Sequence, residues 1–312
     1  MNTKHHLVAL LLIALLLPAC VTNSQTTATP QATDAASNAP TPPPAKPAQP
    51  LPASERLGIV LPLTHPDARV HIPDRLLDNP PETLPVIVHF HQGFNWLSEE
   101  MHTHNINAIL VFFSPGGLSS KYKMPMIENP QLFDQLLAEG LDAARAQPQL
   151  PDDITIDTIT VTSFSAGFGA VREILKNPRD FDRIDHIVLA DTLYAGYTGD
   201  VADKKVNPDN MVDFLRYARQ AVDGNKTMII THNSYDPPGY ASTAETADYL
   251  LHHLGLQRYN VNYPVGEKLT HNTRAGKGHF EVFSSPRTDG SDHAMHLRYI
   301  GFPLAMLGLP QP

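Results

Sequence analysis

The chain has 312 residues, of which 42% are hydrophobic and 18% are charged, a balance that supplies enough apolar side chains for a sizeable globular core. Acidic residues outnumber basic ones by 32 to 23, the formal net charge is −9, and no cluster of lysine and arginine occurs. These features argue against a nucleic-acid partner, for which a basic patch is expected. The single cysteine, Cys20, excludes an intrachain disulfide.

The first 20 residues have the pattern of an export signal. Lys4 supplies a positive charge, residues 7–17 form an unbroken apolar run, and Leu17-Pro18-Ala19-Cys20 closes it. The run is too short for a stable membrane-spanning helix and is typical of a signal peptide. Its end is similar to a bacterial lipobox, so we expect the sulfur of Cys20 to carry lipid. An ordinary secretory signal with a chance cysteine is the alternative.

A lipid on Cys20 would hold the protein on a membrane surface without crossing it. The expected location is therefore the bacterial cell envelope, on the periplasmic or surface side of a membrane and most simply the outer one. Residues 21–53 are mainly Thr, Ala, Pro, Ser, Asn and Gln, with hardly any large apolar side chain. Such a segment buries too little surface to fold and acts as a semi-rigid spacer. A single domain is expected over residues 54–312.

Strands and helices are predicted to alternate along this domain. Apolar runs, read in chain order, indicate strands, and Pro62 favours an edge position for the first of them. Helical spacing and caps indicate the helices, for example Ser242 or Thr243 as an N-cap and Gly255 as a C-cap. The expected strands are 57–63, 68–72, 84–89, 106–113, 159–163, 184–190, 227–231 and 279–285, and the expected helices are 130–147, 171–175, 207–222, 242–254 and 293–307.

This alternation implies right-handed βαβ units and therefore an α/β fold with a mainly parallel, doubly wound sheet flanked by helices. In such open sheets, ligands bind outside the carboxyl ends of the strands. The polar segments that follow the predicted strands are for this reason the candidate site.

The segment Ser163-Phe164-Ser165-Ala166-Gly167 joins a β-branched strand directly to a helix. This is the pattern of a nucleophile elbow, in which small residues flank a serine at the apex of a sharp turn. Ser165 would be the nucleophile. The usual pattern has glycine where this chain has Ser163. A buried strand followed by a turn without chemistry is the alternative interpretation.

A serine hydroxyl needs a base, and the base needs an orienting acid. His293 follows the last predicted strand across a loop and is the preferred base. His279 begins that strand and so should lie at the opposite, amino end of the sheet, while His296 is a third choice. Asp191 and Asp236 each follow a strand, and the sequence does not choose between them as the acid.

Backbone N–H groups of Ala166 and of Gln92 or Gly93 are predicted to stabilise the oxyanion, since donors fixed at such a position are each worth about 2.7–4 kcal/mol. The histidine pairs of this chain lack matching cysteine or carboxylate spacing, so no metal site is expected, and no cofactor is implied.

From about residue 55 onward, the chain resembles the α/β-hydrolase superfamily of esterases, lipases and peptidases. The resemblance rests on the strand that leads into His91-Gln92-Gly93, on the elbow at Ser165, and on the later acid and histidine. It implies that the nucleophile, the acid and the histidine follow one another in this order along the chain. Ser163 and Gln92 depart from the family pattern.

The main expectation is a serine hydrolase that cleaves a small carboxylic ester in the cell envelope through an acyl-enzyme at Ser165, with amide cleavage as a variant. A non-catalytic lipoprotein that uses the same fold to bind a ligand or partner is the alternative from another class. A metal-dependent hydrolase is a third hypothesis, which chelation would test.

Overall fold

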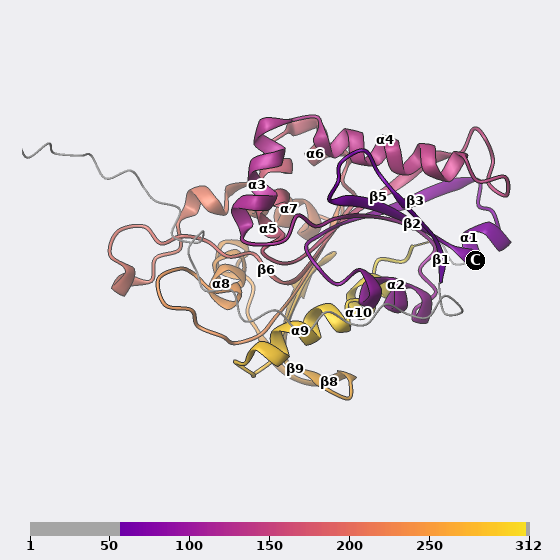
Figure 1. Ribbon diagram of the computed structural model, residues 1–312. Helices are drawn as coiled ribbons and strands as arrows, with labels where there is room; N and C mark the ends of the chain where they lie inside the picture. Colours follow the sequence, from indigo (N-terminus) through magenta and orange to yellow (C-terminus); the bar gives the residue numbers. More distant parts are fainter. Residues whose placement is uncertain (1–56, 310–312) are drawn as a thin grey trace, which may run out of the picture. The chain divides into compact units, whose positions relative to one another are not determined.

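The computed structural model describes residues 57–309 (Figure 1). The expected signal peptide, Cys20 and the linker at 21–53 lie outside the described residues, as does the expected domain start at residue 54. Among the described residues, no helix combines the length and the apolar character needed to cross a bilayer.

Ten strands form one sheet in the described part of the chain. They are β1 (Gly58–Pro62), β2 (Ala68–Pro73), β3 (Thr83–Phe90), β4 (Ile109–Phe113), β5 (Thr155–Ser165), β6 (His186–Thr192), β7 (Thr227–His232), β8 (Tyr259–Gly266), β9 (Leu269–Lys277) and β10 (Phe280–Ser284). Their order in space is β1-β2-β4-β3-β5-β6-β7-β10-β9-β8.

The six central strands, from β4 to β10 in this order, run parallel to one another, whereas β1, β2, β9 and β8 are antiparallel to their neighbours. The sheet is therefore mixed with a parallel centre, which confirms the predicted fold class. β1 is the edge strand that Pro62 indicated, since an edge position tolerates a residue without an N–H.

Helices cover both faces of the sheet. They are α1 (Asp74–Asp78), α2 (Phe94–Thr103), α3 (Ser119–Glu128), α4 (Leu132–Arg145), α5 (Phe168–Ile174), α6 (Pro178–Arg183), α7 (Val212–Val222), α8 (Thr243–Leu254), α9 (Gly290–Arg298) and α10 (Gly301–Ala305). Helices α3 to α8 pack on one face, and α2, α9 and α10 pack on the other (Figure 1).

Alternation along the strands creates two cores. In β3, Val86 and Val88 belong to the core under α3 to α8, while Ile87 between them belongs to the core under α2, α9 and α10. Successive side chains of a strand point to opposite faces, so a strand that is apolar throughout requires cover on both sides. The continuous apolar runs of the sequence thus dictate the doubly wound arrangement.

The structure corrects the sequence prediction at the carboxyl end. The predicted single helix at 293–307 is two helices, because α9 begins three residues earlier, capped by the Asp289 carboxylate on the N–H of Asp292, and ends at Arg298. The hairpin of β8 and β9 was not predicted. β8 is largely exposed and carries no clear apolar alternation, so only its pairing with β9 and the pairing of β9 with β10 define it.

Helices α1, α2, α3 and α6 were also absent from the prediction, whereas the predicted caps of α8 are confirmed. Ser242 accepts a hydrogen bond from the N–H of Glu245 and the Glu245 carboxylate accepts one from the N–H of Ser242, and Gly255 ends the helix in the left-handed region.

Candidate active site

Ser165 ends β5 at the apex of a strained turn. Its φ of 46° lies in the left-handed region, which a serine occupies only where the surrounding structure enforces it. Helix α5 begins three residues later and passes so close to β3 that a Cβ on Gly167 would lie 2.3 Å from the Phe90 carbonyl oxygen. The turn thus has the geometry of a nucleophile elbow, and glycine is needed at the position where helix and strand approach.

Ser163, which occupies a position where the elbow pattern usually has glycine, stabilises the turn. Its hydroxyl donates to Thr192 Oγ1 at 3.3 Å, and the Thr192 hydroxyl donates to the backbone carbonyl of Ser165 at 2.7 Å. All three residues are buried. A chain of two hydrogen bonds between β5 and the end of β6 therefore fixes the backbone at the apex of the elbow.

Asp191 and His293 form a buried pair at the carboxyl end of the sheet. Asp191 lies near the end of β6, next to β5, and His293 lies on α9. The Nδ1–H of His293 donates to Asp191 Oδ2 at 2.7 Å. This bond fixes the tautomer of the imidazole and leaves the lone pair on Nε2, the arrangement that a general base requires.

The Asp191 carboxylate is fully buried and accepts two hydrogen bonds besides that of His293: one from the Thr243 hydroxyl at 2.7 Å and one from the backbone N–H of Asn233 at 3.2 Å. Burial by itself would raise the pKa of Asp191. The positive charge available on His293 and the hydrogen bonds from His293 and Thr243 outweigh burial, and the pKa is lowered well below its usual range. Asp191 is consequently an ionised group that can stabilise a protonated His293.

The imidazole of His293 stacks on Phe164, the residue before Ser165, with ring centroids 4.5 Å apart and 30° between the planes. This contact brings α9 to the elbow. Within residues 57–309, Ser165 Oγ makes no hydrogen bond, so the Ser165–His293 link of a complete triad is open in this structure. Such bonds are often long or misaligned without substrate and tighten on binding.

The other candidates lie elsewhere. Asp236 is at the surface with its side chain 61% exposed, and it forms an ion pair with Lys204 at 2.6 Å rather than meeting His293. His279 accepts the N–H of Met228 on its carbonyl at the beginning of β7, the end of the sheet opposite to Ser165.

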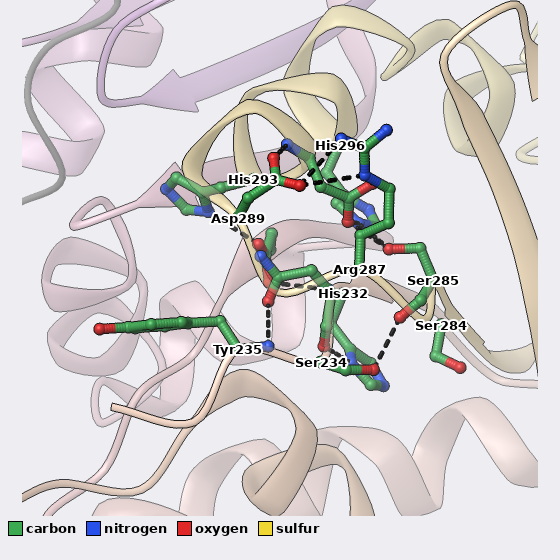
Figure 2. Close-up of polar contacts among 12 residues, drawn as sticks. His232, Ser234, Tyr235, Ser284, Ser285, Arg287, Asp289, His293 and His296 are labelled. Carbon is green, nitrogen blue, oxygen red and sulfur yellow. Dashed lines mark hydrogen bonds and ion pairs between the residues drawn. The ribbon is translucent and has the colours of Figure 1, made fainter. Parts of the chain in front are cut away.

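His296 lies on the same helix as His293 but points into a different buried cluster (Figure 2). Its Nε2 lies 3.3 Å from the hydroxyl of Ser285 and 3.7 Å from Asp292 Oδ2. His296 is 1% exposed, so substrate does not reach it, and of the two histidines on α9 His293 is the one next to the elbow.

The predicted oxyanion loop connects β3 to α2. Gly93 has a φ of 102° and caps α2, and a Cβ there would lie 2.3 Å from the Leu297 side chain on α9, so the position demands glycine. The backbone of Gln92 is fixed by the buried His89, which donates a hydrogen bond to the Gln92 carbonyl at 3.2 Å. Ala166 follows Ser165 at the elbow. The N–H groups of Gln92, Gly93 and Ala166 thus belong to two turns at the same edge of the sheet, and their role as oxyanion donors stays a prediction.

His91 also lies in this region, although no role was predicted for it from the sequence. It has a φ of 103°, and its ring lies 5.8 Å from that of Phe164. Burial, together with the charges available on His89 and His293, lowers the pKa of His91 to about 3. Burial also raises the pKa of Tyr122 to about 12, so its O–H stays protonated near pH 7, and its oxygen forms a hydrogen bond of 2.5 Å with His91 Nδ1. His91 is therefore a neutral imidazole near pH 7.

The part of the chain that the structure describes contains no group of three or more His, Cys, Asp or Glu side chains arranged to hold a metal ion.

No family model matches the chain, and neither does the sequence of any curated protein. Solved structures that are similar to it include an uncharacterised protein from Capnocytophaga ochracea, at 12% identity and a TM-score of 0.45 over 77% of this chain and 59% of that one. A ferulic acid esterase has 11% identity and a TM-score of 0.42, with 78% and 96% covered. A cold-adapted esterase from an Arctic intertidal metagenomic library has 13% identity and a TM-score of 0.41, with 80% and 92% covered. At this similarity they assign no activity to the chain, which spans little more than half of the first of them.

Proposed function

We propose that this protein is a serine hydrolase that cleaves a carboxylic ester. The observation that carries the proposal is the buried hydrogen bond between His293 and Asp191 beside the strained elbow at Ser165. Nucleophile, acid and histidine occur in the chain order of elbow-type hydrolases. The mixed α/β sheet, with these three residues at the carboxyl ends of β5 and β6 and on α9, is the fold in which such sites occur.

In the proposed reaction, Ser165 Oγ attacks the ester carbonyl carbon while His293 Nε2 takes the hydroxyl proton. The tetrahedral oxyanion is held by the N–H groups of Ala166 and of Gln92 or Gly93. It collapses to an acyl-enzyme when the alkoxide leaves with the proton from His293. Water then attacks the acyl carbonyl with His293 again as base, which releases the acid and restores Ser165. Asp191 remains ionised throughout and stabilises the imidazolium.

Covalent labelling with a fluorophosphonate probe tests the proposal directly. The wild-type chain should be labelled and should hydrolyse p-nitrophenyl acetate, whereas Ser165→Ala should do neither. Ser234→Ala is a matched control, because this serine donates to the Ser285 carbonyl away from the elbow. Labelling of Ser165→Ala at the wild-type level would refute the assignment.

The alternative is a non-catalytic protein that binds a ligand at the same edge of the sheet. The unbonded Ser165 hydroxyl is the observation that favours it. This alternative predicts no labelling of the wild-type chain and no difference between the wild type and His293→Ala in any hydrolysis assay.

We also propose that the protein acts in the bacterial cell envelope, anchored by lipid on Cys20. The support is the apolar run at 7–17 and the lipobox-like ending, both from the sequence. Incorporation of radiolabelled palmitate into the wild-type chain and not into Cys20→Ser would support the anchor. An unlabelled, released wild-type chain would refute it.

A further inference from the structure

A cavity of about 160 Å³ lies directly beside His293. Its wall contains the three tyrosines Tyr194, Tyr235 and Tyr240, together with Asn233 and Asp289. In Figure 2 the phenol ring of Tyr235 and the imidazole of His293 extend to the same side of the cluster, away from Ser284 and Ser285. The cavity is therefore continuous with the proposed base and is the natural place for a part of the substrate next to the reacting ester.

The size of the cavity matches one six-membered ring. An apolar protein cavity of roughly 150 Å³ binds a single benzene molecule, so about 160 Å³ holds one ring with a small substituent. A long acyl chain or a fused ring system would not fit within it.

The wall is suited to an aromatic ring. Tyr194 and Tyr240 meet edge to face, with centroids 5.5 Å apart and planes 70° apart, and Phe168 packs against Tyr194 at 5.7 Å. Aromatic rings prefer offset or edge-to-face neighbours. These side chains should therefore bind a further aromatic ring more tightly than a saturated ring of the same size. Burial raises the pKa of Tyr240 to about 12, so its phenol is neutral at neutral pH.

Charge on the wall disfavours an anion. Asp289 is a carboxylate, and its hydrogen bonds from Arg287 lower its pKa, so it is ionised at neutral pH. Among the described residues that line the cavity, none is lysine or arginine. Arg287 pairs with Asp289 and offsets its charge, and no cationic side chain lines the cavity to bind a carboxylate or phosphate on the ring.

One polar group on the wall can select a substituent. Asn233 Oδ1 accepts the N–H of Tyr235 at 3.0 Å, which fixes the orientation of the amide. Within residues 57–309 its NH₂ group has no hydrogen-bond partner, although Asn233 is only 3% exposed. Because Asn233 lines the cavity, this NH₂ group is available to a ligand that brings an oxygen acceptor.

We propose that this cavity binds one neutral, oxygen-substituted aromatic ring, so that the substrates are esters that carry a phenolic group. The inference rests on the proposed hydrolase function for the reaction but not for the binding. Tyr194 and Tyr240 hold the ring, Asn233 donates to its oxygen substituent, and the ester lies at His293.

Binding to Ser165→Ala, which cannot turn over the ester, tests the inference without an activity measurement. Titration calorimetry with methyl 4-hydroxybenzoate should give at least tenfold tighter binding than methyl cyclohexanecarboxylate, a saturated ester of similar size. The dianion of 4-hydroxyphenyl phosphate should bind more weakly still. Equal affinity for the aromatic and saturated esters would overturn the inference.

Variants in the Ser165→Ala background locate the binding. Tyr240→Ala should weaken methyl 4-hydroxybenzoate at least tenfold, whereas Tyr259→Ala, an exposed tyrosine on β8, should not change it. If Tyr240→Ala does not fold, Tyr235→Ala serves instead, since this ring is 44% exposed. Asn233→Ala should abolish the preference for methyl 4-hydroxybenzoate over methyl benzoate. Unchanged binding in a folded tyrosine variant would contradict the assignment of the cavity.

The two proposals fail separately. Ring binding without fluorophosphonate labelling of the wild-type chain would refute the hydrolase while supporting the cavity's ligand class. Labelling without ring binding would support the hydrolase and refute the cavity assignment.

Discussion

His293 and Asp191 are 102 residues apart in the chain, yet His293 Nδ1 lies 2.7 Å from Asp191 Oδ2 in a buried setting. Asp191→Asn should keep the shape of the site but favour the wrong imidazole tautomer, because an amide can donate to Nδ1. If Asp191 and His293 act as proposed, kcat for p-nitrophenyl acetate should fall by about 10⁴, as in known Ser-His-Asp enzymes. Steady-state kinetics on a variant with an unchanged circular dichroism spectrum measures this.

Asp236→Asn is the matched control for that variant. It breaks only an exposed ion pair with Lys204, which solvent screens, and Asp236 lies away from His293. Both kcat and the midpoint of thermal unfolding should stay close to wild type. A loss of activity in Asp236→Asn as large as that in Asp191→Asn would assign the acid differently.

Thr192 connects Ser163 to the backbone of Ser165. Thr192→Val leaves the Ser163 hydroxyl and the Ser165 carbonyl without this buried partner, and each unsatisfied group costs about 1–3 kcal/mol. We expect a lower free energy of unfolding in urea and slower labelling of Ser165, with Thr192→Ser restoring both. Thr160→Val on the neighbouring strand β5 is the control, because its buried hydroxyl has no partner among the described residues. Equal effects of the two valine variants would contradict a specific role of Thr192.

Gly167 allows α5 to approach β3. In Gly167→Ala the new Cβ would meet the Phe90 carbonyl oxygen at 2.3 Å, and since that atom is backbone, the elbow itself must shift. A loss of at least about 1–3 kcal/mol in stability is expected, together with lost labelling. Gly196→Ala, whose nearest atom is Asn210 Oδ1 at 3.5 Å, should be tolerated. Thermal unfolding of the two variants side by side gives the comparison.

Four buried histidines should make stability depend on pH. Burial lowers the pKa of His89 and His232 to about 4 and of His91 and His271 to about 3. The unfolded chain, with an ordinary histidine pKa near 6.5, then binds more protons than the folded one below that pH. The stability that these neutral histidines contribute is complete above pH 6.5 and is lost as the pH falls toward 3–4. For each histidine, the free energy of unfolding falls by at most about 1.4 kcal/mol per pH unit.

Urea unfolding at pH 7.5 and pH 5.0 checks this direction, since the midpoint should be clearly lower at pH 5.0. His271→Phe isolates one contribution, because His271 lies among the aromatic rings of Phe283 and Phe302. This variant should fold at pH 7.5 and lose less stability on acidification than wild type. A midpoint that is the same at both values of pH would contradict the prediction.

The central strands and the elbow were predictable because the local sequence encodes them. Apolar runs such as that of β3 must be covered on both faces, whatever their neighbours are. The turn at Ser165 was likewise predictable, because it requires a small residue at position 167 and the sequence has glycine there. The hairpin of β8 and β9 was not predictable, since its residues are mostly exposed and its pairing is decided by the edge that β10 offers.

The sequence by itself predicted an α/β fold, with Ser165 and candidate acid and histidine residues in the segments that follow its strands. It could not choose between Asp191 and Asp236, because both follow a strand and the sequence does not give the direction that the loop takes after either one. Tertiary structure shows which of the two contacts His293. β6 lies beside β5, α9 returns across the sheet, and Asp191 is enclosed by three donors, while Asp236 turns outward to Lys204. A buried carboxylate is retained only where such donors converge, and their convergence is a property of the packed fold.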